Sequence, residues 1–310
     1  MNFLIVGPGA MGCLFAARLK LAGHVVTLLD HIEQRAELIN KQGIRVEGIL
    51  GEYTVQVPTM IGAIPAEPDV AVICVKANET RTAAQDIRPI IGPRAYVLTL
   101  QNGLGNLEVL QEVFGSQRAL GGVTAEGATL LGDGHVRHAG HGDTKFGSET
   151  PMGDALADMV AAFNDAGFKT QSAENVSGLI WGKLIVNVGI NALTAITGLK
   201  NGRLPDVAGT MAVMEKAVIE AVAVSRAKGI ELPYKDPLGR VVEVCRATAA
   251  NIASMLQDVL KQAVTEVAFI NGAIVREGKA FAIPTPVNET LTCLVQAIQE
   301  TYQERVIRQA

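Results

Sequence analysis

Short apolar runs rich in β-branched residues alternate with helical patterns in the first half of the chain. This alternation is typical of βαβ units, in which parallel strands form a sheet and helices cover both of its faces. The predicted strands and helices are Asn2–Val6, Met11–Ala22, Val25–Leu29, Ile32–Lys41, Val70–Val75, Thr80–Ile87, Ala95–Leu100, Gly142–Gly147, Pro151–Ala166 and Phe168–Ser172. The pattern therefore predicts an α/β domain over residues 1–172.

The strand pattern disappears after Ser172, and long helical periodicities take its place. The predicted helical segments are Val176–Thr197, Val207–Lys228, a stretch from Pro237 through Ile274, and a last helix from an N-cap at Thr285, through Pro286, to about Ile307. Pro in the first turn is typical of a helix start. We expect an all-α domain over residues 173–310.

Three polar side chains interrupt the nearly apolar run 179–199, and they are Lys183, Asn187 and Asn191. Steps of four advance about 40° each around a helix, so the three point the same way. A buried ammonium has a large desolvation penalty and is tolerated mainly when it is paired and useful. The stripe is either one wall of an active site or a buried polar network that fixes helix packing.

Composition narrows the class of protein. The 310 residues are 48% apolar and 19% charged with a net charge of −4, which fits neither a disordered chain nor a basic nucleic-acid binder. The four cysteines are far apart, without a C-x-x-C pair, and the start of the chain lacks signal-peptide features. The polar stripe argues against a membrane span. We expect a soluble cytoplasmic protein with small-molecule partners, and neither nucleic acid nor membrane.

A glycine-rich turn follows the first predicted strand and opens the first predicted helix. Its residues, Gly7, Pro8, Gly9, Ala10, Met11 and Gly12, match the pattern G-x-G-x-x-G. In this context the first glycine permits the tight turn, the second lets a pyrophosphate approach the backbone, and the third lets helix and strand pack closely. The alternative is a strand–helix turn without a ligand. The position of the motif favours dinucleotide binding.

Asp30 ends the second strand, where an acidic side chain typically holds the ribose hydroxyls of NAD. Asp30 and Glu33 are also spaced as a capping box for the helix that follows. His31 and Arg35 are close enough in sequence to contact the 2′-phosphate of NADP instead. The residues leave the cofactor preference open.

Polar residues follow two further strands at the carboxyl edge of the predicted sheet, where open α/β folds bind ligands. Lys76 follows Val70–Val75, and Asn102 follows Ala95–Leu100 within Gln101-Asn102-Gly103. The alternatives are a solvated surface charge for Lys76 and an ordinary turn for Asn102.

Three histidines recur at steps of three, at His135, His138 and His141. Interleaved glycines keep them off one helix face, and no nearby cysteine or carboxylate pattern completes a tetrahedral site. The sequence predicts no metal site.

Several separated segments resemble the ketopantoate (2-dehydropantoate) reductases, a branch of the 6-phosphogluconate dehydrogenase-like group. They occur in the same order along essentially the whole chain: IVGPGAMG, ICVKA, LQNGLGN, WGKLIVNVGINALTAI, NGRL and NIASMLQDVLKQAVTEVAFINGAI. The resemblance implies a Rossmann-type dinucleotide-binding domain over residues 1–172 and a helical substrate and catalytic domain over residues 173–310. It implies NAD(P)H-dependent reduction of ketopantoate to pantoate, in pantothenate and coenzyme A biosynthesis.

The resemblance also implies roles for individual residues. Lys183 would donate the proton to the ketone oxygen, with Asn187 and Asn191 positioning substrate on the same helix. Asn201 and Ser254 would contact substrate hydroxyl and carboxylate, and Asn102 would contact both ligands. Lys76 and Glu266 would help to hold the cofactor or the catalytic lysine. Independently of the family, a protonated amine is suited to stabilise the charge that hydride addition builds on a ketone oxygen, and a buried Glu266 would offset the desolvation of Lys183. The alternative for Glu266 is a solvent-facing helix residue.

The chain departs from the family at Asp30, where a basic residue commonly holds the 2′-phosphate of NADPH. We expect NADPH as the cofactor, with weak discrimination against NADH. The alternative functions are reduction of another branched 2-keto acid and dinucleotide sensing without turnover. The expected substrate is a small 2-keto acid, and a homodimer is a candidate assembly.

Overall fold

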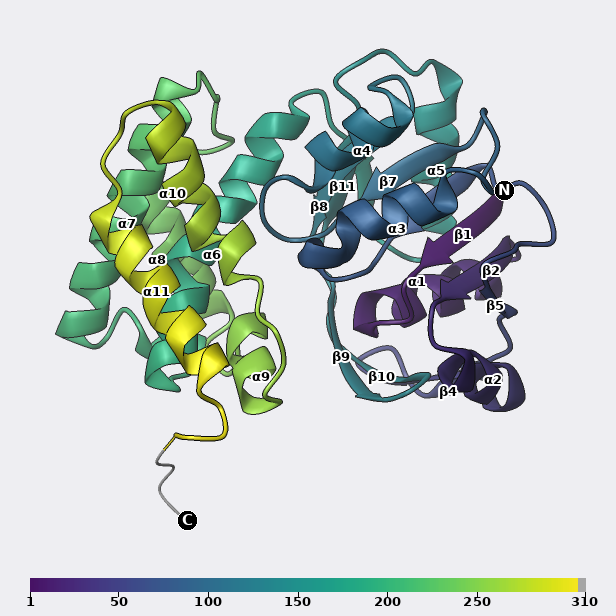
Figure 1. The fold of residues 1–310 in the computed structure, drawn as a ribbon, viewed down its shortest axis with the longest axis horizontal. Coiled ribbons are helices and arrows are strands. Elements are labelled where there is room, and N and C mark those ends of the chain that lie inside the picture. Colours follow the sequence, from purple (N-terminus) through teal and green to yellow (C-terminus); the bar gives the residue numbers. More distant parts are fainter. Residues whose placement is uncertain (306–310) are drawn as a thin grey trace. The chain divides into compact units, whose positions relative to one another are not determined.

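The structure is a computed structural model that describes residues 1–305, and its chain divides into two compact units (Figure 1). The first unit contains residues 1–101 and 105–176, and the second contains residues 102–104 and the chain from Ser177 on. A predominantly parallel sheet organises the first unit and helices make up the second, so the fold class predicted from the sequence is confirmed.

The main sheet of the first unit has the strand order β12-β11-β8-β7-β6-β1-β2-β5. Neighbouring strands are parallel except β8 and β11. The strands are β1 Asn2–Val6, β2 Val25–Asp30, β5 Thr59–Ile61, β6 Val70–Ile73, β7 Tyr96–Thr99, β8 Ala119–Thr124, β11 Thr144–Gly147 and β12 Thr170–Ser172. Consecutive residues along the central strands β1 and β6 are buried, because helices cover both faces of the sheet.

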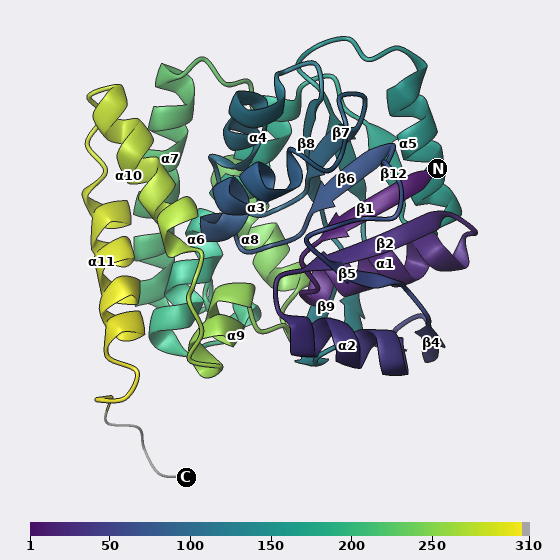
Figure 2. The same ribbon diagram turned by 45° about the vertical axis from the view of Figure 1, so that its right-hand side comes forward.

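The helices of this unit lie on the two faces of the sheet. Figures 1 and 2 show α3 and α4 together on one face, with α1 and α5 on the other. The helical elements are α1 Ala10–Leu21, α2 Glu33–Gln42, η1 Ala77–Glu79, α3 Thr80–Ile87, α4 Asn106–Phe114 and α5 Asp154–Asp165. On the α1 side, the ring of Phe163 packs at 5.3–6.1 Å, centroid to centroid, from four other phenylalanines, and the aromatic cluster consists of Phe3, Phe15, Phe146, Phe163 and Phe168.

A smaller four-stranded sheet, with the order β4-β3-β10-β9, belongs to the same unit. Its strands are β3 Ile44–Gly48, β4 Tyr53–Val55, β9 Gly127–Gly132 and β10 His135–Gly140. β10 pairs in parallel with β3 and antiparallel with β9. The sequence pattern did not predict this second sheet, because its strands are partly exposed and β3 pairs with the distant β10.

The helical unit is built around α6, Val176–Thr197. The other elements are η2 Asn201–Arg203, α7 Ala208–Ala227, α8 Pro237–Ala247, α9 Ser254–Leu260, η3 Val267–Phe269, α10 Asn271–Ala280 and α11 Pro286–Glu300. Trp181, Leu184, Ile185 and Val188 of α6 are buried in the core of this unit. A Cβ on Gly189 would lie 2.7 Å from Cγ1 of Val241, so this glycine lets α8 pack closely against α6.

By length and composition, α6 is apolar enough to cross a membrane. However, 67% of its most apolar stretch is buried inside the protein, as in the core helix of a globular unit.

Two helix predictions need correction. The stretch from Pro237 through Ile274 is divided into α8, α9, η3 and the start of α10 instead of running as a long helical segment. The last helix begins at the predicted cap, Thr285, but ends at Glu300, and the predicted end at Ile307 lies outside the described residues.

Candidate active site

The glycine turn lies between the ends of β1 and α1. Gly7 has φ +101°, and a Cβ on it would lie 2.8 Å from Cγ1 of Val75. A Cβ on Gly12 would overlap the carbonyl oxygen of Gly7. Both positions therefore require glycine for the fold itself.

Gly9 differs from the other two glycines of the motif. Its φ is −70°, and a Cβ on it would make only an ordinary contact, 3.7 Å from the carbonyl oxygen of Cys74. The fold thus does not explain why this residue is glycine, whereas the close approach of a pyrophosphate would. Gly9 is the N-cap of α1, whose first turn has no acidic residue, so its N–H groups and dipole suit a phosphate.

The ends of β2 and β6 flank this turn. The N–H of Gly7 donates to the carbonyl oxygen of Leu29 at 3.0 Å, and the N–H of Cys74 donates to that of Val6 at 2.8 Å. Asp30 is the last residue of β2, and Lys76, three residues after the end of β6, is exposed as the N-cap of η1. The predicted cofactor residues of the first unit therefore gather at one edge of its sheet.

Asp30 is a buried carboxylate with several donors. Its Oδ1 accepts from the N–H groups of His31 at 2.7 Å and Ile32 at 3.1 Å. The guanidinium of Arg35 donates to both oxygens, from Nε to Oδ2 at 2.6 Å and from Nη2 to Oδ1 at 2.5 Å. Burial alone would raise the pKa of Asp30, but the hydrogen bonds from Arg35 and from the backbone lower it below its usual value.

This geometry corrects the capping-box hypothesis. The N-cap of α2 is Ile32, whose side chain makes no cap, and Asp30 lies two residues before it. Asp30 instead anchors Arg35, whose side chain is 20% exposed, while the side chain of His31 is 73% exposed.

Gln101 ties together the loops that follow β6 and β7. Its Nε2 donates to the carbonyl oxygen of Val75 at 2.7 Å and to Oγ1 of Thr80 at 2.9 Å. The hydroxyl of Thr80 donates in turn to Oδ1 of Asn106 at 2.9 Å. In the sequence, Gln101 stands out only as part of a turn, and Thr80 only as the start of a predicted helix. Gln101 and Thr80 follow neighbouring strands of one parallel sheet, and this shared position in the sequence could have indicated that they lie close together.

The predicted polar stripe lies on α6, with Lys183 and Asn187 half-buried and Asn191 buried. Burial lowers the pKa of Lys183 to about 8, and the negative charge of Glu266 opposes this shift. Glu266 is only 9% exposed and is the N-cap of η3, so its alternative as a solvent-facing helix residue is wrong.

Asn102 belongs to the helical unit although it follows a strand of the sheet. Its Nδ2 lies 3.5 Å from Oε2 of Glu266, and the N–H of Leu104 donates to the carbonyl oxygen of Phe269 at 2.9 Å. A Cβ on Gly103, which has φ +87°, would lie 2.5 Å from that same carbonyl oxygen. The structure thus places Lys183 and Asn102 near the carboxylate of Glu266.

Asn201 and Ser254 lie at the starts of η2 and α9. Nδ2 of Asn201 donates to Oγ1 of Thr248 at 2.9 Å, and its backbone N–H donates to the carbonyl oxygen of Asn251 at 3.2 Å. Oδ1 of Asn201 is buried without a hydrogen-bond partner among residues 1–305, so this acceptor suits a ligand hydroxyl. Ser254 is exposed three residues beyond Asn251.

Family models match both units of the chain. One, described as ketopantoate reductase PanE/ApbA, matches residues 3–150, and its C-terminal counterpart matches residues 175–299. The chain belongs to the ketopantoate reductase family.

Curated relatives and solved structures agree with this assignment. The 2-dehydropantoate 2-reductase of Halobacterium salinarum is 37% identical over 303 residues, which cover 96% of this chain and 99% of that protein. A PanE/ApbA family ketopantoate reductase from Ralstonia eutropha has a TM-score of 0.90 at 34% identity, covering 98% of this chain and all of that one.

A second kind of enzyme shares the same fold. D-mandelate dehydrogenase, in a ternary structure with NADH and anilino(oxo)acetate, has a TM-score of 0.90 at 26% identity and covers 98% of this chain and all of that one. The fold is therefore shared with a protein whose structure contains NADH and anilino(oxo)acetate.

Proposed function

We propose that this protein reduces 2-dehydropantoate to pantoate with a reduced nicotinamide dinucleotide, a step in pantothenate and coenzyme A biosynthesis. The observation that carries this proposal is the half-buried ammonium of Lys183 opposite the buried carboxylate of Glu266. An enzyme with this function would act on a small keto acid in the cytoplasm. The homodimer stays a prediction.

Lys183 acts as the general acid. A pKa of about 8 leaves this amine mostly protonated at neutral pH, yet makes it a stronger acid than an ordinary lysine. The ammonium stabilises the negative charge that develops on the ketone oxygen and then delivers the proton to it. Glu266 keeps the amine charged, and Asn102 is the residue whose amide holds Glu266.

Four polar residues of the helical unit bind the substrate in this proposal. Asn187 and Asn191 follow Lys183 by one and two turns on α6 and orient the keto acid. The unpartnered Oδ1 of Asn201 accepts from a substrate hydroxyl, and the exposed hydroxyl of Ser254 donates to the carboxylate.

The cofactor is held by the glycine turn, with Lys76 at the neighbouring strand end, and when bound it supplies the hydride. We propose NADPH, because Asp30 already accepts from three donor groups and fixes the guanidinium of Arg35 at the end of β2. Arg35 uses Nε and Nη2 on Asp30, its side chain is 20% exposed, and its third nitrogen, Nη1, would contact the 2′-phosphate.

The first experiment measures the oxidation of NADPH spectrophotometrically with a panel of 2-keto acids. We expect kcat/KM to be highest for 2-dehydropantoate. A preference for an aryl 2-keto acid, the substrate type suggested by the likeness to D-mandelate dehydrogenase, would favour the alternative reductase function. Dinucleotide binding without turnover of any keto acid would favour a sensor.

The second experiment tests the cofactor by comparing kcat/KM for NADPH and NADH. We expect Arg35→Ala to lower the value for NADPH far more than that for NADH. Asp30→Ala should weaken the preference for NADPH less, because it only frees Arg35. A wild-type preference for NADH that Asp30→Ala removes would instead show that Asp30 binds the ribose.

A further inference from the structure

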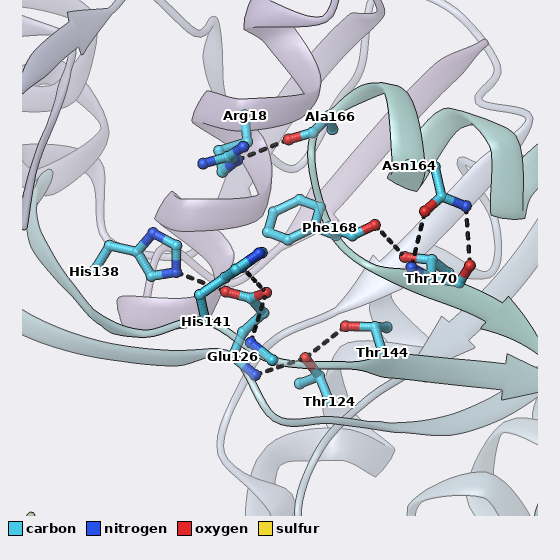
Figure 3. Close-up of polar contacts among 11 residues, drawn as sticks. Arg18, Thr124, Glu126, His138, His141, Thr144, Asn164, Ala166, Phe168 and Thr170 are labelled. Carbon is cyan, nitrogen blue, oxygen red and sulfur yellow. Dashed lines mark hydrogen bonds and ion pairs between the residues drawn. The ribbon is translucent and has the colours of Figure 1, made fainter. Parts of the chain in front are cut away.

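A buried carboxylate in the sheet unit contacts two imidazoles, away from the glycine turn in sequence. Glu126 lies between β8 and β9, His138 lies on β10, and His141 directly follows β10. Nε2 of His138 lies 2.6 Å from Oε2 of Glu126, and Nδ1 of His141 lies 2.8 Å from Oε1 (Figure 3). The sequence showed no carboxylate pattern that completes a site with these histidines, whereas the fold places Glu126 against two of them.

Local backbone features direct both histidines to one carboxylate. Residues three apart on a regular strand point to opposite faces of the sheet. Here the register of β10 against β9 shifts between His138 and Gly140, and such irregularities re-aim side chains. A Cβ on Gly142 would lie 2.7 Å from Cβ of Ala125, so this glycine lets the end of the turn close over Glu126.

The cluster has the donor set of a transition-metal site. One atom from each residue, two imidazole nitrogens and a carboxylate oxygen, lies within 4.8 Å of the others. Figure 3 shows both imidazoles directed at this carboxylate, and the backbone N–H of Gly142 also donates to its Oε1, at 3.4 Å.

We propose that Glu126, His138 and His141 bind a zinc ion. Two nitrogen ligands and one carboxylate suit Zn²⁺, whereas Mg²⁺ and Ca²⁺ prefer oxygen ligands alone. Tetrahedral Zn²⁺ holds ligand atoms about 3.3 Å apart, so the carboxylate must retreat from each imidazole by roughly half an ångström, and any wider pair, within 4.8 Å here, must close to that distance. The side chain of His141 is 23% exposed while those of Glu126 and His138 are buried, so a water molecule reaches the fourth position from the His141 side.

A carboxylate only accepts, so each contacting ring nitrogen carries a proton here; Zn²⁺ would take the place of these protons, which would move to the other nitrogen of each ring. Nδ1 of His138 is buried without a hydrogen-bond partner among residues 1–305. The contact of Nε2 with Glu126 is therefore the interaction that sets the tautomer of this ring. The metal would fasten the β8–β9 connection to the end of β10, which is a structural role.

The test uses the full chain without a histidine tag, stripped of metal with a chelator and titrated calorimetrically with ZnCl₂. Cys293 is an exposed thiol, so all proteins carry Cys293→Ser. We expect one Zn²⁺ per chain, and binding at least tenfold weaker in His141→Ala, because even the loss of an outer-shell partner typically weakens binding by that factor. His135→Ala is the matched control, because His135 lies on the same strand but contacts Glu47 instead.

Failure of the parent protein to bind Zn²⁺, or equal binding by His141→Ala, would overturn the proposal. His141 is partly exposed, and circular dichroism separates loss of binding from loss of folding in this variant. Anomalous diffraction from zinc-soaked crystals gives a second measurement. The ion should lie about 2.0–2.2 Å from Nε2 of His138, Nδ1 of His141 and a Glu126 oxygen, and an ion elsewhere would contradict the assignment.

Discussion

At the scale of single residues, the proposed chemistry depends on a balance of two effects at Lys183. Burial favours the neutral amine, whereas the charge of Glu266 favours the ammonium, and burial is the larger effect. The outcome is an acid whose pKa lies near physiological pH, which is where a proton donor is most effective.

Replacing the amine removes both charge stabilisation and proton delivery. We expect Lys183→Ala to lower kcat by about 10²–10⁴, with little change in cofactor affinity, because the glycine turn belongs to the other unit. Steady-state kinetics and a dinucleotide-binding titration measure the two effects. Lys216→Ala, an exposed lysine on α7, is the control. A Lys183→Ala enzyme with the kcat of the wild type would remove this residue from the mechanism.

The pH dependence of kcat tests the interaction between Lys183 and Glu266. A general acid must be protonated, so kcat should fall as pH rises through about 8. Glu266 raises the pKa of Lys183, and Glu266→Gln should therefore move the fall in kcat to lower pH. The measurement is kcat at saturating substrate and cofactor across the pH range, with Glu215→Gln, an exposed residue of α7, as control. An unchanged profile in Glu266→Gln would argue against the electrostatic coupling.

At the scale of elements, the sequence predicted the helices and strands whose apolar residues or glycines are regularly spaced within the element itself. The helix Val176–Thr197 and the strand and turn around Gly7 were predicted because apolar spacing and glycine positions are local signals. The smaller sheet was missed because β4 has only three residues and because β3 pairs with β10, which lies far along the chain. The breaks between α8 and α10 follow tertiary contacts, such as that of Asn201 with Asn251.

The site was predictable to a similar extent. The stripe on α6 could be read from spacing alone, and Glu266 could be proposed from an apolar neighbourhood. The anchoring of Arg35 by Asp30 could not, because a carboxylate at a strand end looks the same whether it faces a ribose or a guanidinium. The contact of Glu126 with two histidines was equally hidden, since it depends on the pairing of β9 with β10.

Two glycines of the turn should have different roles: Gly9 in dinucleotide binding and Gly12 in the packing of the fold. Gly9→Ala fits the fold, so we expect unchanged thermal stability but a raised KM for the dinucleotide, because the new methyl group faces the pyrophosphate. Gly12→Ala should lower the melting temperature, since its Cβ overlaps the carbonyl oxygen of Gly7. Melting curves and kinetics of both variants test this. Normal dinucleotide binding by Gly9→Ala would contradict the proposed role of the turn.

At the scale of the whole molecule, each unit has a hydrophobic core of its own. A ligand that binds only the folded form stabilises the unit that holds it. At a concentration of about 100 times its Kd, NADPH should add about 2.7 kcal/mol to the free energy of unfolding of the sheet unit. Urea unfolding followed by circular dichroism measures this gain. Gly9→Ala should lose the gain, and a wild-type protein indifferent to NADPH would argue against cofactor binding there.

The buried Trp181 of α6 is the only tryptophan of the chain, and it precedes Lys183 by two residues. Its emission overlaps the absorption band of reduced nicotinamide but not that of the oxidised ring. The helix that holds the proposed general acid therefore carries an intrinsic energy-transfer donor. Quenching of this single fluorophore by NADPH, recorded with and without keto acid, would follow the approach of the nicotinamide to α6 during turnover without any added label.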